Sequence, residues 1–175
     1  MNKHSILFWI AIVLLPACGL AGETRIHCEG QEANRDTYLA MHKILFMERD
    51  GSRVGEFYAP EFISHNQDEG GGSQELVTHS DMAAMWEQSK LRTPNRVMTN
   101  NLILCVDDFV IARVVMKGHR VGLPGQEPGS EGRYYEASAI DIYRFENGKV
   151  VERWGNNDGV TIMRQLGLLP AAGSD

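Results

Sequence analysis

The C-terminal part of the chain carries the pattern that most restricts its fold. Residues 133–146 alternate apolar and polar side chains, which predicts a β-strand. Asn147-Gly148 follows, a dipeptide typical of a tight hairpin turn, and residues 149–155 predict the returning strand. Residues 156–170 predict a short closing helix. The chain is therefore expected to end in a β-hairpin and a helix.

Two carboxylates accompany this hairpin. Asp141 lies in the middle of the first strand, and Asp158 lies where the second strand gives way to the helix. Burial among apolar side chains raises the pKa of a carboxyl, which can then take and return a proton near neutral pH. Asp141 is a candidate of this kind; the alternative is an ion pair with Arg113 or Arg153 on a neighbouring strand. Residues two apart share a strand face, so its expected face-mates are Tyr135, Ala137, Ala139, Tyr143 and Phe145.

Length and composition indicate one globular domain. The chain has 175 residues, of which 43% are hydrophobic and 23% are charged. Its formal net charge is −6, and it has no basic stripe. Because nucleic-acid binding depends on positive charge, we expect no nucleic-acid partner.

Residues 1–22 predict a signal peptide. A charged start precedes the apolar residues 6–15, and small residues follow. That apolar run is too short to span a bilayer, which needs about 20 residues. Cleavage near Gly22 would release a soluble periplasmic or extracellular protein. The alternative is a lipoprotein signal ending before Cys18, since residues 15–18 resemble a lipobox; a lipid on Cys18 would tether the domain to a membrane.

Two further cysteines remain, Cys28 and Cys105. Export would place them in an oxidising compartment, where they can form a disulfide. The alternative is two separate thiols, with Cys105 acting as a small core residue. The sequence leaves this choice open.

Helical patterns dominate the first half of the chain. Residues 23–33 are polar and predict a flexible segment. Asn34 or Asp36 then caps a helix that runs to about Arg49 and carries one apolar stripe. Two more helices are expected, a short one over residues 54–58 and a longer one that starts at Thr78 or Ser80 and ends before Pro94.

Strands dominate the second half. A short strand over residues 62–66 precedes the last long helix, and strands over residues 96–106 and 109–120 precede the hairpin. Glycine-rich loops are expected at residues 68–73 and 122–132. Helices followed by an antiparallel meander give an α+β class. A sheet bent around the helices would leave an apolar cavity between the two layers, suited to a small ligand.

Three segments resemble a known family. Residues 147–154, Asn-Gly-Lys-Val-Val-Glu-Arg-Trp, and residues 164–167, Arg-Gln-Leu-Gly, resemble the C-terminal pattern of the SnoaL-like polyketide cyclases, within the nuclear transport factor 2-like superfamily. Residues 58–66 resemble the N-terminal segment of the same family. The resemblance covers residues 34–170 and leaves residues 171–175 as a tail. It implies a cone-shaped α+β fold, with N-terminal helices packed on a strongly curved antiparallel sheet that encloses a pocket, and a homodimer formed through the open sheet face.

The chain departs from the family pattern at two positions. Arg153 stands where the family usually has His, and Gly155 stands where many members have Asp. The acid comes three residues later, at Asp158, which makes Asp158 the catalytic candidate that the resemblance implies. The alternative is that Asp158 only caps the closing helix, since Asp is a favoured N-cap residue.

The remaining site candidates are expected to bind substrate. The resemblance places His65 and Asn66 at the pocket, where they would hydrogen-bond a carbonyl or enolate oxygen; the alternative is a polar strand end. His119 adjoins a glycine-rich loop and faces either the pocket or solvent. Trp154 is expected to share a strand face with Val150 and Glu152, where it either stacks against a flat ligand or packs in the core. Tyr143 is expected to share the strand face of Asp141. No metal site is expected, because the histidines lack paired zinc spacing.

These features predict a cofactor-independent acid/base enzyme. We expect an exported protein of cyclase or aldol-condensation, isomerase or dehydratase type, acting on a small apolar carbonyl compound. Asp158 or Asp141 would take the proton. The alternative is a non-catalytic module that binds small hydrophobic ligands in the cell envelope, which the export signal favours.

Overall fold

A computed structural model describes residues 23–66, 73–170 and 173. The expected signal peptide, residues 1–22, and most of the expected tail lie outside these ranges. Within them, no helix combines the length and the apolar character needed to cross a bilayer.

A single seven-stranded sheet forms the frame of the fold, in the order β1-β4-β5-β6-β7-β2-β3. Strands β4 to β7 form the predicted antiparallel meander. The sheet as a whole is mixed, however, because β1 pairs parallel with β4, and β2 pairs parallel with β7. The strands are β1 (Arg25–His27), β2 (Tyr58–Asn66), β3 (Ser73–Thr78), β4 (Val97–Val106), β5 (Phe109–Arg120), β6 (Arg133–Glu146) and β7 (Lys149–Asn157).

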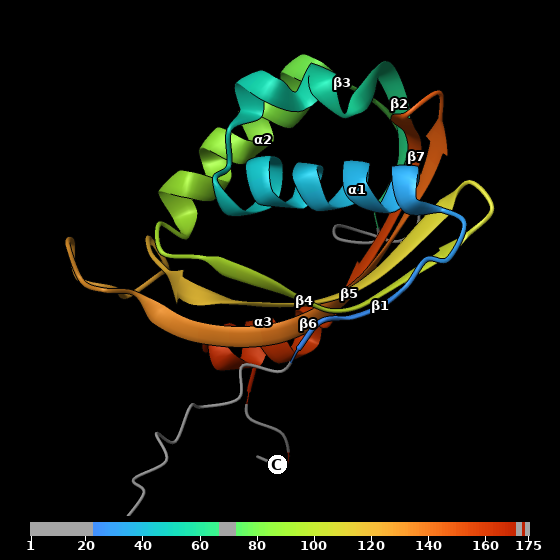
Figure 1. Cartoon of the computed structure of the whole chain (residues 1–175). Helices are drawn as coiled ribbons and strands as arrows, with labels where there is room; N and C mark the ends of the chain where they lie inside the picture. Colours follow the sequence, from blue (N-terminus) through green and yellow to red (C-terminus); the bar gives the residue numbers. More distant parts are fainter. Residues whose placement is uncertain (1–22, 67–72, 171–172, 174–175) are drawn as a thin grey trace, which may run out of the picture.

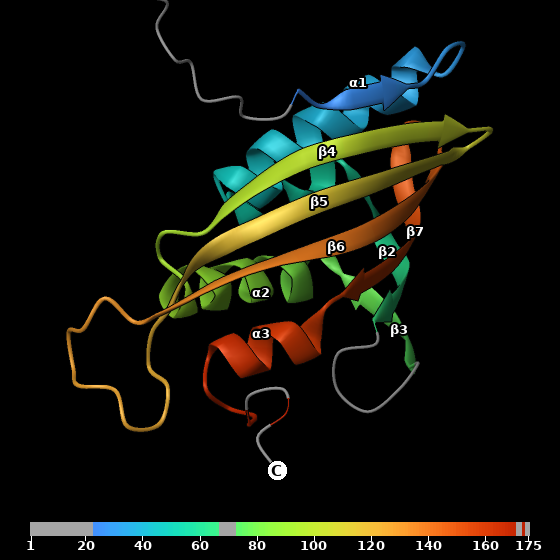
Figure 2. The same cartoon turned by 90° about the horizontal axis from the view of Figure 1, so that it is seen from below.

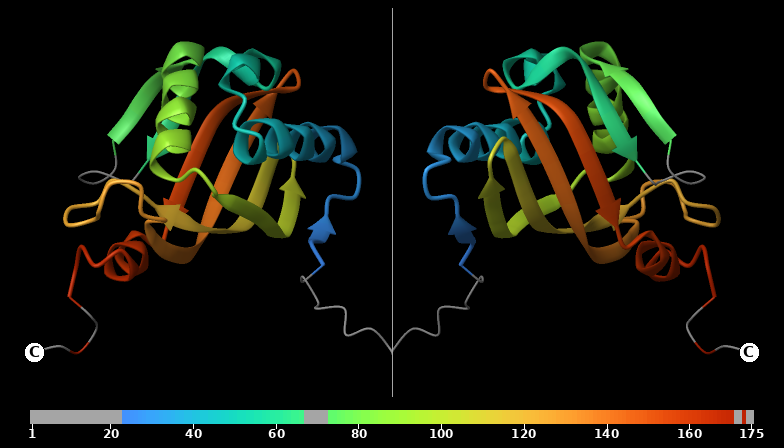
Figure 3. Two further views of the ribbon diagram at one scale, coloured as in Figure 1. Left: turned by 90° about the vertical axis from the view of Figure 1, so that its left-hand side faces the viewer. Right: turned by 90° about the vertical axis from the view of Figure 1, so that its right-hand side faces the viewer.

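Helices cover the inner face of the curled sheet. Figure 1 shows α1 and α2 lying across this face, and both side views in Figure 3 show the strands bending around them. The last helix, α3, lies beside β6 at the end of β7 (Figure 2). The helices are α1 (Glu32–Met41), which continues as the π-helix η1 (His42–Met47), the 3-10 helix η2 (Gly51–Glu56), α2 (His79–Arg92) and α3 (Gly159–Gln165). The predicted α+β class with a strongly curved sheet is confirmed.

Local capping explains where α2 begins, but not where α1 begins. The predicted start of α2 is confirmed: the Thr78 side chain accepts a hydrogen bond from the Asp81 backbone, and the Asp81 carboxylate accepts one from the Thr78 backbone. The first helix begins earlier than predicted, at Glu32, and neither Asn34 nor Asp36 caps it. Its cap residue, Gln31, uses no side-chain bond, so the expected cap signal was absent.

The segment 23–33, predicted to be flexible, is instead attached to the sheet. Residues 25–27 pair with β4, and the Thr24 hydroxyl donates to the Asn100 carbonyl over 2.7 Å. Cys28 and Cys105 form a disulfide, so of the two alternatives left open by the sequence, a disulfide and two separate thiols, the structure has the disulfide. The prediction was wrong because a three-residue edge strand is stabilised by distant partners that the polar local sequence does not reveal.

The core lies between the helices and the inner face of β4 to β7. The predicted apolar stripe of the first helix supplies Tyr38, Met41 and Leu45, all buried. They pack toward the sheet, where Tyr143 lies 5.5 Å from the Tyr38 ring centroid. The Tyr38 hydroxyl donates to the buried Asn100 side chain over 2.7 Å, which satisfies both polar groups inside the core.

The disulfide should contribute substantially to stability, because it joins cysteines 77 positions apart. A bridge that closes a long loop restricts the unfolded chain and typically stabilises a fold by roughly 2–4 kcal/mol. We expect the Cys28→Ser/Cys105→Ser variant to lose about this much free energy of unfolding in urea titrations. A variant as stable as the oxidised protein would contradict this role.

His42 should make stability depend on pH. Burial lowers the pKa of this side chain from its ordinary value of 6.5 to about 4. In the unfolded chain, His42 thus becomes protonated below about pH 6.5, whereas in the folded protein it becomes protonated only near pH 4. Stability should be full above pH 6.5 and fall as pH drops toward 4, by roughly 3 kcal/mol at most.

Urea unfolding of His42→Phe at several pH values checks this expectation. The variant should lose part of the decline in stability below pH 6.5, whereas His27→Gln, a change on the exposed strand β1, should keep it. An unchanged decline in His42→Phe would show that other groups cause it.

Candidate functional site

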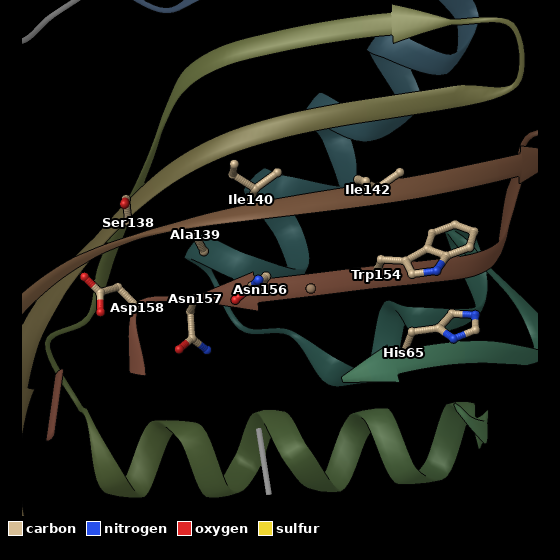
Figure 4. A pocket seen from close by; sticks show the side chains of 10 residues that line it. His65, Ser138, Ala139, Ile140, Ile142, Trp154, Asn156, Asn157 and Asp158 are labelled. Atoms are coloured by element: carbon tan, nitrogen blue, oxygen red, sulfur yellow. The ribbon is translucent and has the colours of Figure 1, made fainter. Parts of the chain in front are cut away.

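Two cavities lie on opposite faces of the β6–β7 hairpin. Strand alternation turns Asp141 toward the helices, and its neighbours Ile140 and Ile142 toward the opposite face. The first cavity, here called the inner cavity, has a volume of about 220 Å³ and is lined by Asp141 and Arg153. The second, the outer cavity, has about 690 Å³ and is lined by Ile140, Ile142 and Trp154 (Figure 4).

The inner cavity is the hollow predicted between the helices and the sheet. Its helical wall comes from η1 and α2, with Phe46 and Trp86 in edge-to-face contact at 4.9 Å between ring centroids. Methionine side chains adapt to ligands of different shape, so this lining suits a small apolar molecule. The four methionines of the cavity are Met82, Met85, Met98 and Met116.

An ion pair stands inside this cavity. The Arg153 guanidinium donates to the Asp141 carboxylate over 2.7 Å, and both side chains are largely buried. Across the hairpin, Tyr143 is opposite Arg153, and Asp141 is opposite Gly155. A Cβ atom at position 155 would lie 2.6 Å from the Arg153 Nη2 atom and 3.0 Å from the Asp141 Oδ1 atom. The two departures from the family pattern therefore belong together, because Gly155 leaves the space in which Arg153 reaches Asp141.

The charge of the pair affects the groups around it. Burial acts to lower the pKa of Arg153, but the adjacent Asp141 carboxylate outweighs it, and the pKa is raised. Burial, with the Asp141 charge adding to it, raises the pKa of the Tyr38 and Tyr143 phenols. Burial likewise raises the pKa of Tyr58. The guanidinium thus stays charged, while the surrounding phenols stay neutral.

The outer cavity brings together three predicted site residues. The His65 and Trp154 rings are stacked, with centroids 4.9 Å apart and planes 2° from parallel. Figure 4 shows this pair at one end of the cavity and Asp158 at the other. The His65 Nε2 atom lies 2.9 Å from Glu152 Oε1, and the Arg144 Nε atom donates to Glu152 Oε2 over 3.0 Å. The hydrogen bond to His65, together with the one from Arg144, lowers the pKa of Glu152 despite its partial burial.

A β-bulge corrects the predicted face of Trp154. Val150 pairs with Phe145 and Glu152 pairs with Arg144, so one extra residue stands between Val150 and Glu152. Val150 consequently points into the core, whereas Glu152 and Trp154 point to the outer face. The prediction that Val150 and Trp154 share a face was wrong, because a bulge shifts the alternation by one residue.

Asp158 caps α3, the alternative that the sequence analysis weighed. Its Oδ1 atom accepts a hydrogen bond from the Thr161 backbone over 3.0 Å. The bonds to Thr161 lower the pKa of this carboxyl. The side chain also lines the outer cavity, whereas Asp141 lines the inner one.

Two other candidates, Tyr143 and His119, line none of the described cavities, and the side chain of a third, Asn66, is not described. Tyr143 is fully buried in the core and lines none of the cavities. His119 lies near the end of β5, where its Nδ1 atom is 3.0 Å from the Asn95 side-chain amide. The backbone of Asn66 pairs with Gly155, while its side chain lies outside what the structure describes.

The cavity lining contributed by α2 and by the strand ends was not predicted from the sequence. Trp86 and Arg96 line the inner cavity, and the Arg96 guanidinium lies 5.2 Å from the Trp86 ring centroid. The helical spacing of Met82 and Trp86 indicated a buried helix face. It did not indicate that this face borders a cavity. Among the described residues, no group of three or more His, Cys, Asp or Glu side chains could hold a metal ion.

Comparison with known proteins identifies the relatives of this chain. The model of the SnoaL-like polyketide cyclase family matches residues 35–166. A search of curated proteins gives no match. Among solved structures, the chain is similar to wild-type IdmH from Streptomyces antibioticus, a candidate polyketide cyclase, with 25% identity and a TM-score of 0.65 over 77% of this chain and 98% of that one.

Two further structures share the fold. AclR from Streptomyces galilaeus, a candidate hydroxylase, has 21% identity and a TM-score of 0.63 over 82% of this chain and 86% of that one. An NTF2-like protein of unknown function from Burkholderia pseudomallei has 17% identity and a TM-score of 0.62 over 77% of this chain and 97% of that one. The predicted nuclear transport factor 2-like fold is confirmed.

Removing one partner of the ion pair should lower the free energy of unfolding much more than replacing both partners with apolar residues. Arg153→Met leaves the buried Asp141 carboxylate without this partner, and such a change typically costs roughly 3–5 kcal/mol. The double variant Asp141→Leu/Arg153→Met removes both charges and should recover most of that loss in urea unfolding. A double variant as unstable as Arg153→Met would contradict a dominant electrostatic cost.

Proposed function

Because the chain belongs to the SnoaL-like polyketide cyclase family, we propose that it is a cofactor-independent acid/base enzyme of the cyclase type. Its substrate is a small, largely apolar carbonyl compound that binds in the inner cavity. The observation that carries this proposal is the Asp141–Arg153 pair, which sets a carboxylate and a guanidinium 2.7 Å apart in a cavity whose helical wall carries methionine and aromatic side chains.

The two side chains have complementary roles in this reaction. Asp141 accepts a proton from the carbon beside a substrate carbonyl; the C–H electron pair forms the carbon–carbon double bond of the enolate, and the carbonyl π electrons move to the oxygen. Arg153 carries a permanent positive charge beside Asp141, and its guanidinium stabilises the resulting enolate oxygen. The enolate carbon attacks a second carbonyl of the same molecule and closes a ring. The new alkoxide takes the proton back from Asp141.

Asp141 is preferred over Asp158 as the proton-transfer residue. The Asp158 carboxylate is engaged at the start of α3 and is exposed to water, which weakens its interactions with a ligand. The Asp141 side chain is almost fully buried, and charges in such surroundings act more strongly on a bound molecule than exposed ones do. Fold similarity does not fix the reaction, so isomerisation and dehydration through the same enolate remain within this proposal.

The second candidate function is a non-catalytic module that binds small hydrophobic ligands. The observation in its favour is that the Asp141 carboxylate is already compensated by Arg153. In that case the cavity would hold an apolar molecule, and the pair would only orient it.

We propose export as the setting of either function. The signal-like pattern of residues 1–22 supports it, and so does the Cys28–Cys105 disulfide, because disulfides persist in oxidising compartments. Mass spectrometry of the natural N-terminus separates cleavage near Gly22 from a lipid on Cys18. A full-length N-terminus in the cytoplasm would contradict export.

A homodimer through the outer sheet face is also proposed, as the family resemblance implies. The apolar side chains of Val106 and Ile140 are more than half exposed, which supports a partner on this face. Light scattering tests this assembly, and a monomer at micromolar concentration would contradict it.

Proton abstraction can be measured without the natural substrate. Aryl methyl ketones such as acetophenone exchange their methyl protons slowly in neutral D₂O, so catalysed deuterium incorporation is readily seen by NMR. We expect the protein to accelerate this exchange, and Asp141→Asn to reduce the acceleration by about 10²- to 10⁴-fold. Asp158→Asn is the matched control and should keep most of it.

The same assay separates the two candidate functions. Acetophenone that binds without any accelerated exchange in the wild-type protein would favour the binding module. Exchange that is equal in Asp141→Asn and wild type would eliminate Asp141 as the base.

A further inference from the structure

A third cavity adjoins the inner cavity. It has a volume of about 370 Å³ and shares Met85 and Arg96 among its lining residues with the inner cavity. Arg92 at the end of α2, Arg96 just before β4 and Arg120 at the end of β5 line it together. No Asp or Glu is among its lining residues. We call it the arginine pocket.

The positive charge of the arginine pocket is not neutralised within the described residues. None of their salt bridges involves Arg92, Arg96 or Arg120. Arg96 donates from Nη2 to the Phe46 carbonyl over 3.3 Å, while its Nε atom is buried and has no hydrogen-bond partner there. Buried donors without a partner are uncommon, and they indicate a missing ligand or water.

The surroundings make these charges unfavourable without an anion. Burial lowers the pKa of Arg96, and burial together with the charge of Arg92 lowers the pKa of Arg120. The whole chain carries a formal charge of −6, so three adjacent arginines do not follow from a general excess of basic residues. An anionic group in the pocket would supply the missing compensation.

We propose that the arginine pocket binds an anionic group of the substrate, a carboxylate or a phosphate, while the apolar ring system of the same molecule occupies the inner cavity. The proposal rests on the proposed function only for placing the reacting carbonyl beside Asp141. The shared residues Met85 and Arg96 make the two cavities adjacent, so one amphipathic molecule can fill both. The substrate class is then an aromatic or polycyclic carbonyl acid rather than a neutral ketone.

Three ligands with the same ring test this specificity. Isothermal titration compares naphthalene-2-carboxylate, 2-naphthyl phosphate and the neutral 2-naphthamide. We expect at least one anion to bind roughly tenfold or more tightly than the amide, as for a charge-assisted hydrogen bond. The better of the two anions distinguishes a carboxylate from a phosphate ligand.

Arg120→Gln is the informative variant, because the Arg120 side chain makes no hydrogen bond within the described residues and its loss should not disturb the fold. We expect this variant and Arg96→Gln each to lose most of the preference for the anion. Arg113→Gln, at an exposed position of the same strand β5, is the matched control and should keep it.

Equal binding of the amide and both anions by the wild-type protein would overturn the inference, and so would a preference that survives both variants. Exchange of the neutral acetophenone should depend on Asp141 and not on Arg120, which does not line the inner cavity. Failure of the anion preference with intact exchange would overturn this inference alone, whereas loss of exchange with an intact preference would overturn the proposed reaction alone.

Discussion

The Asp141–Arg153 ion pair is the interaction on which the rest of the site depends. Two charges between a helical layer and a sheet are tolerated only when they compensate each other. Here the compensation requires an arginine on β7, a carboxylate on β6 and the absence of a side chain at Gly155 between them. In the proposed reaction, this pair supplies the charges that act on a carbonyl compound, and the methionine and aromatic side chains supply the apolar contacts.

Four of the predicted site residues line two different cavities. Asp141 faces the inner cavity, whereas His65, Trp154 and Asp158 line the outer one. On the outer face, His65 is stacked on Trp154 and bonded to Glu152, so it takes part in an ordered surface cluster. The outer face is therefore the proposed contact surface for a second copy of the chain, while the inner cavity and the arginine pocket lie next to each other and share lining residues.

Local periodicity was sufficient to predict much of the fold, but not how its faces combine. The alternation of residues 133–146, the Asn147-Gly148 turn and the cap at Thr78 each depend on neighbours in the chain, and each was found where predicted. The attachment of residues 25–27 and the Cys28–Cys105 bridge depend on distant partners. One extra residue in β7 was enough to move Val150 and Trp154 to opposite faces, and such a bulge has no clear sequence signal. The arginine pocket could in principle have been predicted from the sequence, since antiparallel pairing places the end of β5 beside the start of β4.

The central claim is that chemistry takes place in the inner cavity, against the Asp141–Arg153 pair. A crystal structure of the protein soaked with acetophenone tests it most directly. The account predicts density for the ring among the methionines of the inner cavity, with the carbonyl oxygen within hydrogen-bonding distance of Arg153. Density only in the outer cavity, against Trp154 and His65, would contradict it.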